Sequence, residues 1–322
     1  MKVAFRVDGS KKLGLGHVKR CIVLAQNLQK RNITCFFITQ FKEIREFLES
    51  KGLDVFIIQK NNELQQIKQI LTHENCTKLV IDSKRKSIKK LLVNLDKQIK
   101  TVLIDNADYP KQTDLIVISS VKDPKKPYPE NSILGTKYLL HGIEKLSKSR
   151  KPKTNSIILT MGGSDKYNIT KKIVHSFSKC NDDFSLMIIL GKFYNKEKNL
   201  LQIINDDKRF NIIKNPPSLA HLMQCSSIGI SAFGITVYEA AICHLPLLVI
   251  SHSSENDSSA KLTEKYGWIS YVGKYDKINY DELVKTTINL IKNKSKLKEM
   301  VQNCLKIDGL GPSRVANKII KL

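Results

Sequence analysis

A strand pattern, a glycine-containing turn and a helix pattern follow one another at the start of the chain. Residues 2–7 have an alternating side-chain pattern and include β-branched side chains, which predicts a strand. Apolar residues recur at helical spacing over 18–28, which predicts a helix. The turn between them contains Gly14, Gly16 and His17. The first N–H groups of a helix have no partner within it, and glycine allows close approach. The turn can therefore bind a phosphate or another anion.

His17 is the candidate catalytic residue of this turn. A histidine beside a bound phosphate ester is suited to proton transfer, because the reference pKa of an imidazole lies near neutral pH. The alternative is that His17 only caps the helix.

Apolar strand segments alternate with helical patterns along the whole chain, which predicts an α/β protein with parallel sheets. The polar, Pro-containing stretch 147–155 reads as a linker, so we expect one domain over 1–146 and a second over 156–322. Strands are expected at 2–7, 34–39, 55–58, 79–82, 101–104, 115–118, 157–160, 185–190, 210–213, 228–231, 247–250 and 269–272.

The second half contains two more turns of small residues between a strand and a helix. Gly162 and Gly163 follow the first strand of this half, and the segment 232–236 follows a later one. The latter is a second candidate phosphate site. Glu239 lies in the first turns of the following helix, where its carboxylate can accept hydrogen bonds from ribose hydroxyls. The alternatives are an ordinary glycine turn at 162–163 and a Glu239 that only complements the helix dipole.

Composition restricts the class of protein. The formal charge of +24 comes from 54 Lys and Arg against 30 Asp and Glu, and the lysines are dispersed through nearly every segment. Because no nucleic-acid-binding pattern accompanies them, we expect a phosphate-rich substrate or a peripheral contact with an anionic membrane rather than a nucleic acid. No apolar run reaches the roughly 20 residues of a membrane span. We expect a cytoplasmic protein with seven reduced cysteines, no metal and no cofactor.

Residues along nearly the whole chain resemble the UDP-sugar hydrolase family of pseudaminic acid biosynthesis and its spore-coat polysaccharide relatives. They are Arg6, Asp8, Ser10, Gly14, Gly16, His17, Arg20, residues 133–138, Gly162, Gly163, Asp165, the segment 231–239, Asp308, Gly309, Gly311 and Arg314.

The resemblance implies the GT-B fold, with two Rossmann-like parallel-sheet domains facing a central cleft. A last helix over about 313–322 crosses back to the first domain. It also implies hydrolysis of a UDP-linked amino or deoxy sugar at the anomeric C–O bond, in nonulosonic acid or surface-polysaccharide biosynthesis. His17 is then the base, or it positions the water.

The same resemblance assigns the binding residues. Substrate contacts fall on Asp8, Gly14, Leu15, Gly16, Arg20, Gly163 and Asn256. Nucleotide contacts fall on Ala232, Phe233, Gly234, Ile235, Thr236 and Glu239. Helix N-termini and cations can stabilise the leaving diphosphate without a metal, and no obligate protein partner is implied.

Three departures from the sequence pattern of the family leave the identity of the sugar undetermined. Ser83 and Lys84 stand where the family has His-Tyr, Asn256-Asp257 stands for Asn-Gln, and 140–144 replaces a Leu-Arg-x-Glu-Phe stretch. A nucleotide-sugar glycosyltransferase of the same fold is therefore an alternative, because His17 can deprotonate an acceptor hydroxyl as well as water. A third alternative is a non-catalytic basic binding protein, but binding alone needs no histidine in a glycine turn.

Overall fold

The structure, a computed structural model, describes residues 1–10, 14–83, 85–143, 146 and 152–322. It divides into two compact units. Unit 1 comprises Met1–Gly142 with Gly309–Leu322, and unit 2 comprises Ile143–Asp308. The chain thus leaves unit 1 four residues before the end expected at 146, and it returns for the last 14 residues. Of the predicted linker 147–155, residues 147–151 lie outside the described part.

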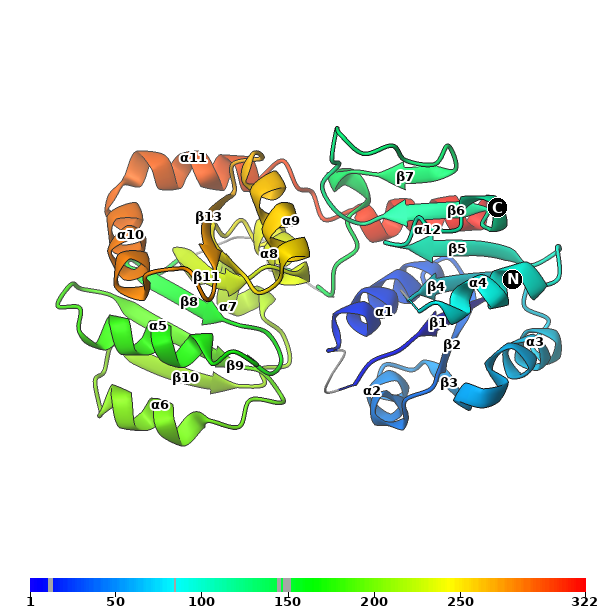
Figure 1. The fold of residues 1–322 in the computed structure, drawn as a ribbon, viewed down its shortest axis with the longest axis horizontal. Helices are drawn as coiled ribbons and strands as arrows, with labels where there is room; N and C mark the ends of the chain where they lie inside the picture. Colours follow the sequence, from blue (N-terminus) through cyan, green and yellow to red (C-terminus); the bar gives the residue numbers. More distant parts are fainter. Residues whose placement is uncertain (11–13, 84, 144–145, 147–151) are drawn as a thin grey trace. The chain divides into compact units, whose positions relative to one another are not determined.

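Unit 1 is built on a parallel sheet with, among the described residues, seven strands in the order β3-β2-β1-β4-β5-β6-β7 (Figure 1). The strands are β1 (Lys2–Val7), β2 (Thr34–Thr39), β3 (Asp54–Ile57), β4 (Lys78–Asp82), β5 (Lys100–Ile104), β6 (Leu115–Ile118) and β7 (Ser132–Leu134). The expected strands of this half match within one residue at each end, whereas β7 was missed. It has only three residues, too few for a recognisable pattern.

Helices cover both faces of the unit 1 sheet, which explains why its strands are nearly continuous apolar runs. Val3 and Phe5 of β1 face the core formed with α1, α2 and α12, while Ala4 faces the core formed with α3 and α4. The helices are α1 (Gly16–Gln29), α2 (Arg45–Glu49), α3 (Glu63–His73), α4 (Ser87–Asn94) and α12 (Gly311–Ile320). Short 3₁₀ turns lie at η1 (Lys42–Ile44), η2 (Lys60–Asn62), η3 (Pro110–Gln112) and η4 (Thr136–Tyr138).

The last helix, α12, is part of unit 1 (Figure 1, red). Val315, Ala316 and Ile319 are fully buried in the same core as α1. The approach is close where the helix begins: a Cβ added to Gly311 would stand 2.1 Å from the carbonyl oxygen of Leu139. The helix begins two residues before the expected start at 313 and ends at Ile320.

Unit 2 repeats the architecture, with six described parallel strands in the order β10-β9-β8-β11-β12-β13. The strands are β8 (Ser156–Thr160), β9 (Ser185–Leu190), β10 (Phe210–Lys214), β11 (Ile228–Ala232), β12 (Leu247–Ser251) and β13 (Ile269–Lys274). The helices are α5 (Ile169–Ser178), α6 (Glu197–Ile204), α7 (Ala220–Gln224), α8 (Ile235–Ile242), α9 (Ser254–Glu264), α10 (Tyr280–Lys292) and α11 (Lys294–Cys304).

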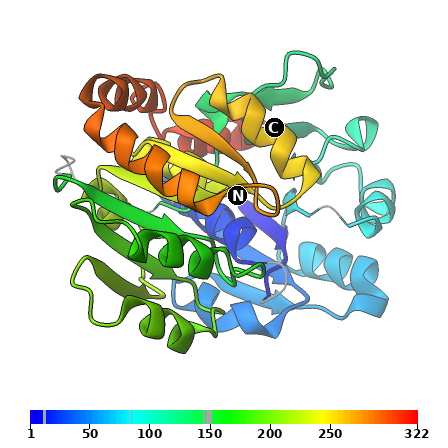
Figure 2. The same ribbon diagram turned by 60° about the vertical axis from the view of Figure 1, so that its left-hand side comes forward.

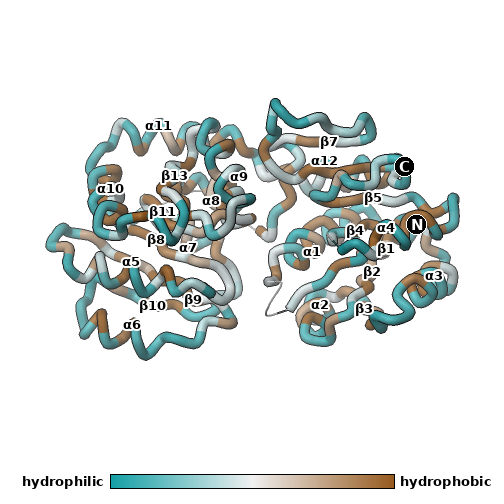
Figure 3. The backbone as a smooth tube through the Cα atoms, in the orientation of Figure 1, coloured by the Kyte–Doolittle hydropathy of each residue, from teal (hydrophilic) through white to brown (hydrophobic). Residues whose placement is uncertain are grey.

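One core of unit 2 lies between its sheet and the helices α5, α6 and α10. Figures 1 and 2 both show α5 and α10 side by side over this face. Figure 3 shows the strands of both units as mainly hydrophobic, with hydrophilic residues along outer helices such as α3 and α6. Five of the seven cysteines are buried: Cys21, Cys35, Cys76, Cys243 and Cys304.

Candidate active site

Each sheet reverses its strand order between two central strands, β1 and β4 in unit 1 and β8 and β11 in unit 2. The connections from the carboxyl ends of such strands diverge to opposite sides, and ligands of open α/β sheets bind in the crevice they leave. The predicted turn at 8–16 follows β1. The turns at 161–165 and 232–236 follow β8 and β11. The predicted motifs therefore lie at the ligand-binding position of their own units.

The turn after β1 presents the N-terminus of α1. Leu15 precedes the helix, and no side chain in the described part of the turn caps it. Gly14 adopts a φ of +78°, which a residue with a Cβ rarely adopts, and its N–H donates to the carbonyl of Ser10 at 2.8 Å. Residues 11–13 lie outside the described part. The N–H groups of the first helical turn, beginning at Gly16, are therefore suited to an anion.

His17, the second residue of α1, contacts the carboxylate at the end of β4. Its Nδ1 lies 2.7 Å from Oδ1 of Asp82. The carboxylate side chain is 1% exposed, and the imidazole is 43% exposed. Because an ionised carboxylate only accepts hydrogen bonds, Nδ1 carries the proton and donates it. In the neutral ring Nε2 is then the atom that can accept a proton.

Asp82 stays ionised although it is buried. Burial by itself raises the pKa of a carboxyl group, but the charge of Arg20 and hydrogen bonds from His17 and Arg20 outweigh it and lower the pKa of Asp82 below its usual range. Arg20 forms a fork on this carboxylate, with Nε 2.6 Å from Oδ2 and Nη2 2.7 Å from Oδ1. The remaining nitrogen, Nη1, donates to Oδ2 of Asp105, which directly follows β5.

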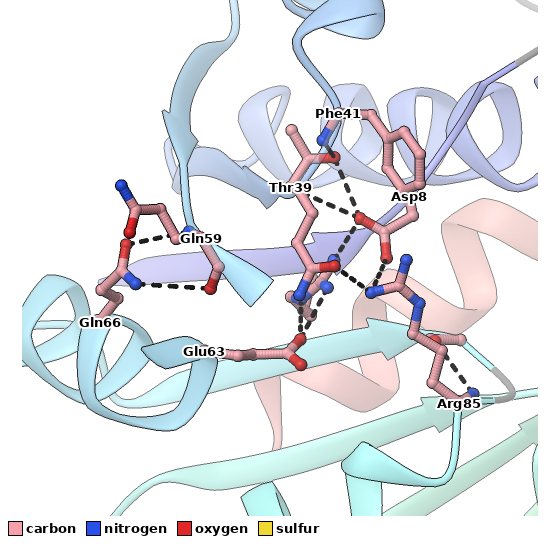
Figure 4. A network of polar contacts seen from close by, with 10 residues as sticks. Asp8, Thr39, Phe41, Gln59, Glu63, Gln66 and Arg85 are labelled. Carbon is pink, nitrogen blue, oxygen red and sulfur yellow. Dashed lines mark hydrogen bonds and ion pairs between the residues drawn. The ribbon is translucent and has the colours of Figure 1, made fainter. Parts of the chain in front are cut away.

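Asp8 belongs to a neighbouring network (Figure 4). Its Oδ1 accepts hydrogen bonds from Nη1 of Arg6 at 2.7 Å and from the backbone N–H of Gln40 at 3.0 Å. Burial tends to raise the pKa of Asp8, but Arg6 lowers it below the usual range. Arg6, itself fully buried, also donates from Nε and Nη2 to Oε1 of Glu63 at 2.9 and 2.7 Å. The carboxylate of Asp8 thus links the end of β1 to the residue that follows β2.

Arg85 closes the network from the segment after β4. Its Nη1 lies 3.3 Å from Oδ2 of Asp8 and also donates to the side chain of Gln40, and the guanidinium stacks over Phe41. Lys84, next to it, lies outside the described residues. Of the predicted site residues in unit 1, His17 and Arg20 meet on Asp82, while Asp8 lies in this adjoining network.

The turn after β11 forms the corresponding place in unit 2. The helix α8 begins at Ile235, and within the described chain no side chain caps it. A Cβ added to Gly234 would have nothing within 4 Å, so the space beside it is open. The hydroxyl of the fully buried Ser231 has no hydrogen-bond partner in the described part of the chain. Glu239 is buried one turn into α8. Donors and open space therefore coincide at this turn.

Asn256 lies against the same turn. It stands in the first turn of α9, and its Nδ2 is 3.5 Å from the carbonyl oxygen of Phe233. The adjoining Asp257 accepts hydrogen bonds from the hydroxyl of Tyr271 and from Lys261. Asn256, which was predicted to contact the sugar, is thus brought next to the predicted nucleotide residues.

The glycine turn after β8 is fixed by its neighbours. Gly162 has a φ of +81°, and the carbonyl of Gly163 accepts a hydrogen bond from the N–H of Phe193 at 2.9 Å. Asp165 caps α5, accepting the N–H groups of Ile169 and Thr170 at 2.9 and 2.8 Å. Its carboxylate therefore stabilises the helix, while the contact of Gly163 with substrate stays a prediction.

Sequence reasoning missed four residues that the structure places beside the predicted ones: Glu63, Asp82, Asp105 and Arg85. A signal existed for two of them, because Asp82 ends a predicted buried strand and Asp105 follows the next one. The carboxyl ends of parallel strands meet at one sheet edge, where acidic residues are candidates for a site. Glu63 and Arg85 lie at helix starts and carried no such signal.

Among the described residues, no group of three or more His, Cys, Asp and Glu side chains is arranged to hold a metal ion, and none of the described helices is long and apolar enough to cross a membrane. A separate pocket of about 240 Å³ in unit 1 has a mainly apolar lining surface, although four of its six lining residues are Lys or Arg. Its lining residues are Lys137, Tyr138, Arg314, Asn317, Lys318 and Lys321.

Comparison with known proteins gives three relatives, and no protein-family model matches the chain. An uncharacterized protein of Methanocaldococcus jannaschii is 30% identical over 274 residues, which are 78% of this chain and 55% of that protein. The chain therefore spans about half the length of that relative. The spore coat polysaccharide biosynthesis protein SpsG of Bacillus subtilis is 25% identical, over 81% of this chain and 80% of that protein.

The third relative is the UDP-2,4-diacetamido-2,4,6-trideoxy-β-L-altropyranose hydrolase of Campylobacter jejuni. It is 22% identical over 280 residues, which cover 83% of this chain and 98% of the hydrolase. The resemblance found in the sequence is thereby confirmed.

Solved structures show the fold. MurG of Acinetobacter baumannii superposes with a TM-score of 0.74 at 11% identity, covering 100% of this chain and 99% of MurG. The UDP-GlcNAc 2-epimerase of Neisseria meningitidis, solved with UDP-GlcNAc bound, has a TM-score of 0.68 at 14% identity over the full length of both chains. The predicted class of two Rossmann-like parallel-sheet domains is confirmed. The chain is a homologue of the spore coat polysaccharide protein and of the altropyranose hydrolase, built on the GT-B fold.

Proposed function

We propose that this protein hydrolyses a UDP-linked amino or deoxy sugar at the anomeric C–O bond and releases UDP and the free sugar. The reaction is a step in nonulosonic acid or surface-polysaccharide biosynthesis. One observation carries the proposal: Nδ1 of His17 lies 2.7 Å from the buried carboxylate of Asp82. An ionised carboxylate only accepts hydrogen bonds, so this contact assigns the proton to Nδ1 and leaves Nε2 to accept one. The homology to a UDP-sugar hydrolase supports it.

The reaction needs one base and a stabilised leaving group. Nε2 of His17 takes a proton from water while the water oxygen attacks the anomeric carbon. The bond from that carbon to the phosphate oxygen breaks, and its electron pair leaves with UDP. The imidazolium then returns its proton to solvent. Backbone N–H groups at a helix N-terminus stabilise negative charge, and α1 presents such a terminus beside His17.

The UDP moiety is assigned to the turn after β11. Backbone groups of residues 232–236 suit the diphosphate, because α8 begins there with its first N–H groups uncapped in the described chain. Glu239 is assigned to the ribose hydroxyls. Substrate contacts in unit 1 are assigned to Gly14, Leu15 and Gly16.

The second candidate function is transfer of the sugar to an acceptor hydroxyl. The fold favours it, since CalG4, the calicheamicin glycosyltransferase, superposes with a TM-score of 0.67 at 12% identity. His17 would deprotonate that hydroxyl in the same way. Hydrolysis and transfer differ only in whether a water molecule or an acceptor hydroxyl lies beside Nε2 of His17.

The purified protein is therefore incubated with UDP-, GDP- and CMP-linked sugars, with and without acceptors, and nucleotide release is followed. We expect release of UDP from one class of UDP-sugar without acceptor. In ¹⁸O-labelled water the label is expected on the sugar and not on UDP, because the broken bond lies between the anomeric carbon and oxygen. Release that depends strictly on an acceptor assigns the protein to the transferases, and label on UDP contradicts attack at the anomeric carbon.

A further inference from the structure

Arg20 faces carboxylates with all three of its nitrogens. Nε and Nη2 donate to the two oxygens of Asp82 at 2.6 and 2.7 Å, and Nη1 donates to Asp105. The side chain is buried in the first turns of α1, with 7% of the residue exposed. Because these bonds orient the guanidinium towards carboxylates and only 7% of the residue is exposed, little of it is open to a sugar or a phosphate.

Asp105 is itself held by the backbone. Its Oδ1 accepts the N–H of Ser119 at 2.6 Å, at the end of the neighbouring strand β6, and its φ of 50° turns the chain sharply after β5. The order of contacts is therefore Ser119, Asp105, Arg20, Asp82 and His17, and Nη2 of Arg20 also lies 3.1 Å from Nδ1 of His17. The ends of three parallel strands and one helix are linked by these contacts.

We propose that Arg20 and Asp105 are positioning residues that act through Asp82 on His17, and that Arg20 is not a substrate ligand. The proposal rests on the proposed function in so far as His17 is the base. Asp105 fixes the guanidinium, and the guanidinium keeps Asp82 ionised and oriented. The carboxylate then holds the proton of His17 on Nδ1.

Removal of the guanidinium has a definite chemical consequence. A buried carboxylate without a cation takes up a proton, because burial disfavours its charged form. A protonated Asp82 donates to Nδ1 of His17 instead of accepting from it. The imidazole proton then moves to Nε2, and that atom can no longer accept a proton from water.

The test compares Arg20→Met and Arg20→Lys with Arg45→Met. Arg45 is an exposed arginine of α2 that pairs with Glu49, so its variant controls for loss of one positive charge. The ring nitrogens of His17 are observed by ¹⁵N NMR in protein with labelled histidines, and the His17 signals are identified by their loss in His17→Asn. Nucleotide release gives kcat and KM for each variant.

We expect wild type and Arg45→Met to carry the proton on Nδ1, and Arg20→Met to shift it to Nε2. In Arg20→Met kcat falls about 10²–10⁴-fold with KM changed less than about threefold, as for loss of a general base. We expect Arg20→Lys to restore part of the lost kcat and part of the proton population on Nδ1. A rise of KM at constant kcat, with the proton still on Nδ1, would make Arg20 a substrate ligand and overturn the proposal.

Asp105→Asn keeps the proposal testable if Arg20→Met does not fold, which thermal melting shows. We expect Asp105→Asn, which leaves the cation beside Asp82, to keep the proton on Nδ1 and to lower kcat less than Arg20→Met does, because the guanidinium then loses only one of its two anchors. The double variant with Arg20→Met should be no worse than Arg20→Met alone, because both act through Asp82. If the two substitutions lower kcat independently, so that their effects add in free energy in the double variant, the two residues do not act through the same carboxylate. If no sugar is hydrolysed even by wild type, the proposed function fails, while the NMR result still decides whether the contacts set the tautomer.

Discussion

Nζ of Lys78 lies 2.7 Å from the carbonyl oxygen of Ile319, and this contact joins the first residue of β4 to the last helix across 241 positions of the chain. A second bond of 2.9 Å reaches the carbonyl of Ile320. The last carbonyl groups of a helix have no partner within it and carry the negative end of its dipole. Lys78 is only 6% exposed, so its ammonium supplies a buried cation to the end of α12.

Lys78→Met should therefore destabilise unit 1. It removes the ammonium donor from the buried carbonyl of Ile319 and the half-buried carbonyl of Ile320, and we expect the free energy of unfolding to fall by about 1–3 kcal/mol. Denaturant unfolding measures the change. Lys90→Met, at an exposed position of α4, should stay within about 0.5 kcal/mol of wild type. Equal effects at the two lysines would show that the contact with α12 contributes nothing.

His17→Ala should leave the fold intact and lower kcat of nucleotide release by about 10²–10⁴-fold, since it removes the base. His73→Ala is the matched control, because that imidazole is 82% exposed on α3. Circular dichroism checks that both variants are folded. A His17→Ala variant that releases nucleotide at the wild-type rate would remove His17 from the mechanism.

Glu239→Ala should weaken binding of UDP to the full-length protein. Loss of charged hydrogen bonds to the ribose costs about 1–3 kcal/mol, which corresponds to a roughly 5- to 150-fold higher Kd. Calorimetric titration with UDP measures it. Glu299→Ala, at an exposed position of α11, should bind like wild type. The nucleotide assignment fails if Glu239→Ala binds UDP as tightly as that control.

Cys35 should make stability depend on alkaline pH. Burial raises the pKa of its thiol from the ordinary 9.0 to about 12, with a smaller contribution from Cys76. The unfolded chain then releases this proton at lower pH than the folded protein. The stability that the neutral thiol contributes is thus complete below pH 9 and is lost as pH rises towards 12, at up to about 1.4 kcal/mol per pH unit.

The measurement for Cys35 is the free energy of unfolding of wild type minus that of Cys35→Ala at each pH. This difference cancels the groups that titrate equally in both proteins, and it should decrease between pH 9 and 12. A constant difference for Cys35 would contradict the raised pKa.

The parts of the structure that depend on neighbouring residues could be predicted from the sequence. The strand at Lys2–Val7 and the helix after Gly16 follow from side-chain periodicity within one segment. The place of His17 at a helix N-terminus follows from the glycines beside it. These features need no knowledge of how distant segments pack.

The partners of His17 could not be predicted in the same way. Asp82 lies 65 positions further along the chain and Asp105 is 85 positions from Arg20, and both meet α1 only because β4 and β5 lie beside β1 in order. Arg20 illustrates the limit. The resemblance predicts a substrate contact for Arg20 from its position in a motif, and that contact stays a prediction, whereas its hydrogen bonds depend on the order of the strands.

The return of α12 to unit 1 has a consequence for synthesis of the protein. Translation delivers residues 1–142 before unit 2 and residues 309–322 after it, so the apolar surface that Val315 and Ile319 cover stays open to water while unit 2 is being made. Unit 1 can reach its final packing only after the ribosome has passed Ile319. A chain that ends before Gly311 keeps this surface exposed, and such exposed surface is what leads to aggregation and to capture by chaperones and proteases.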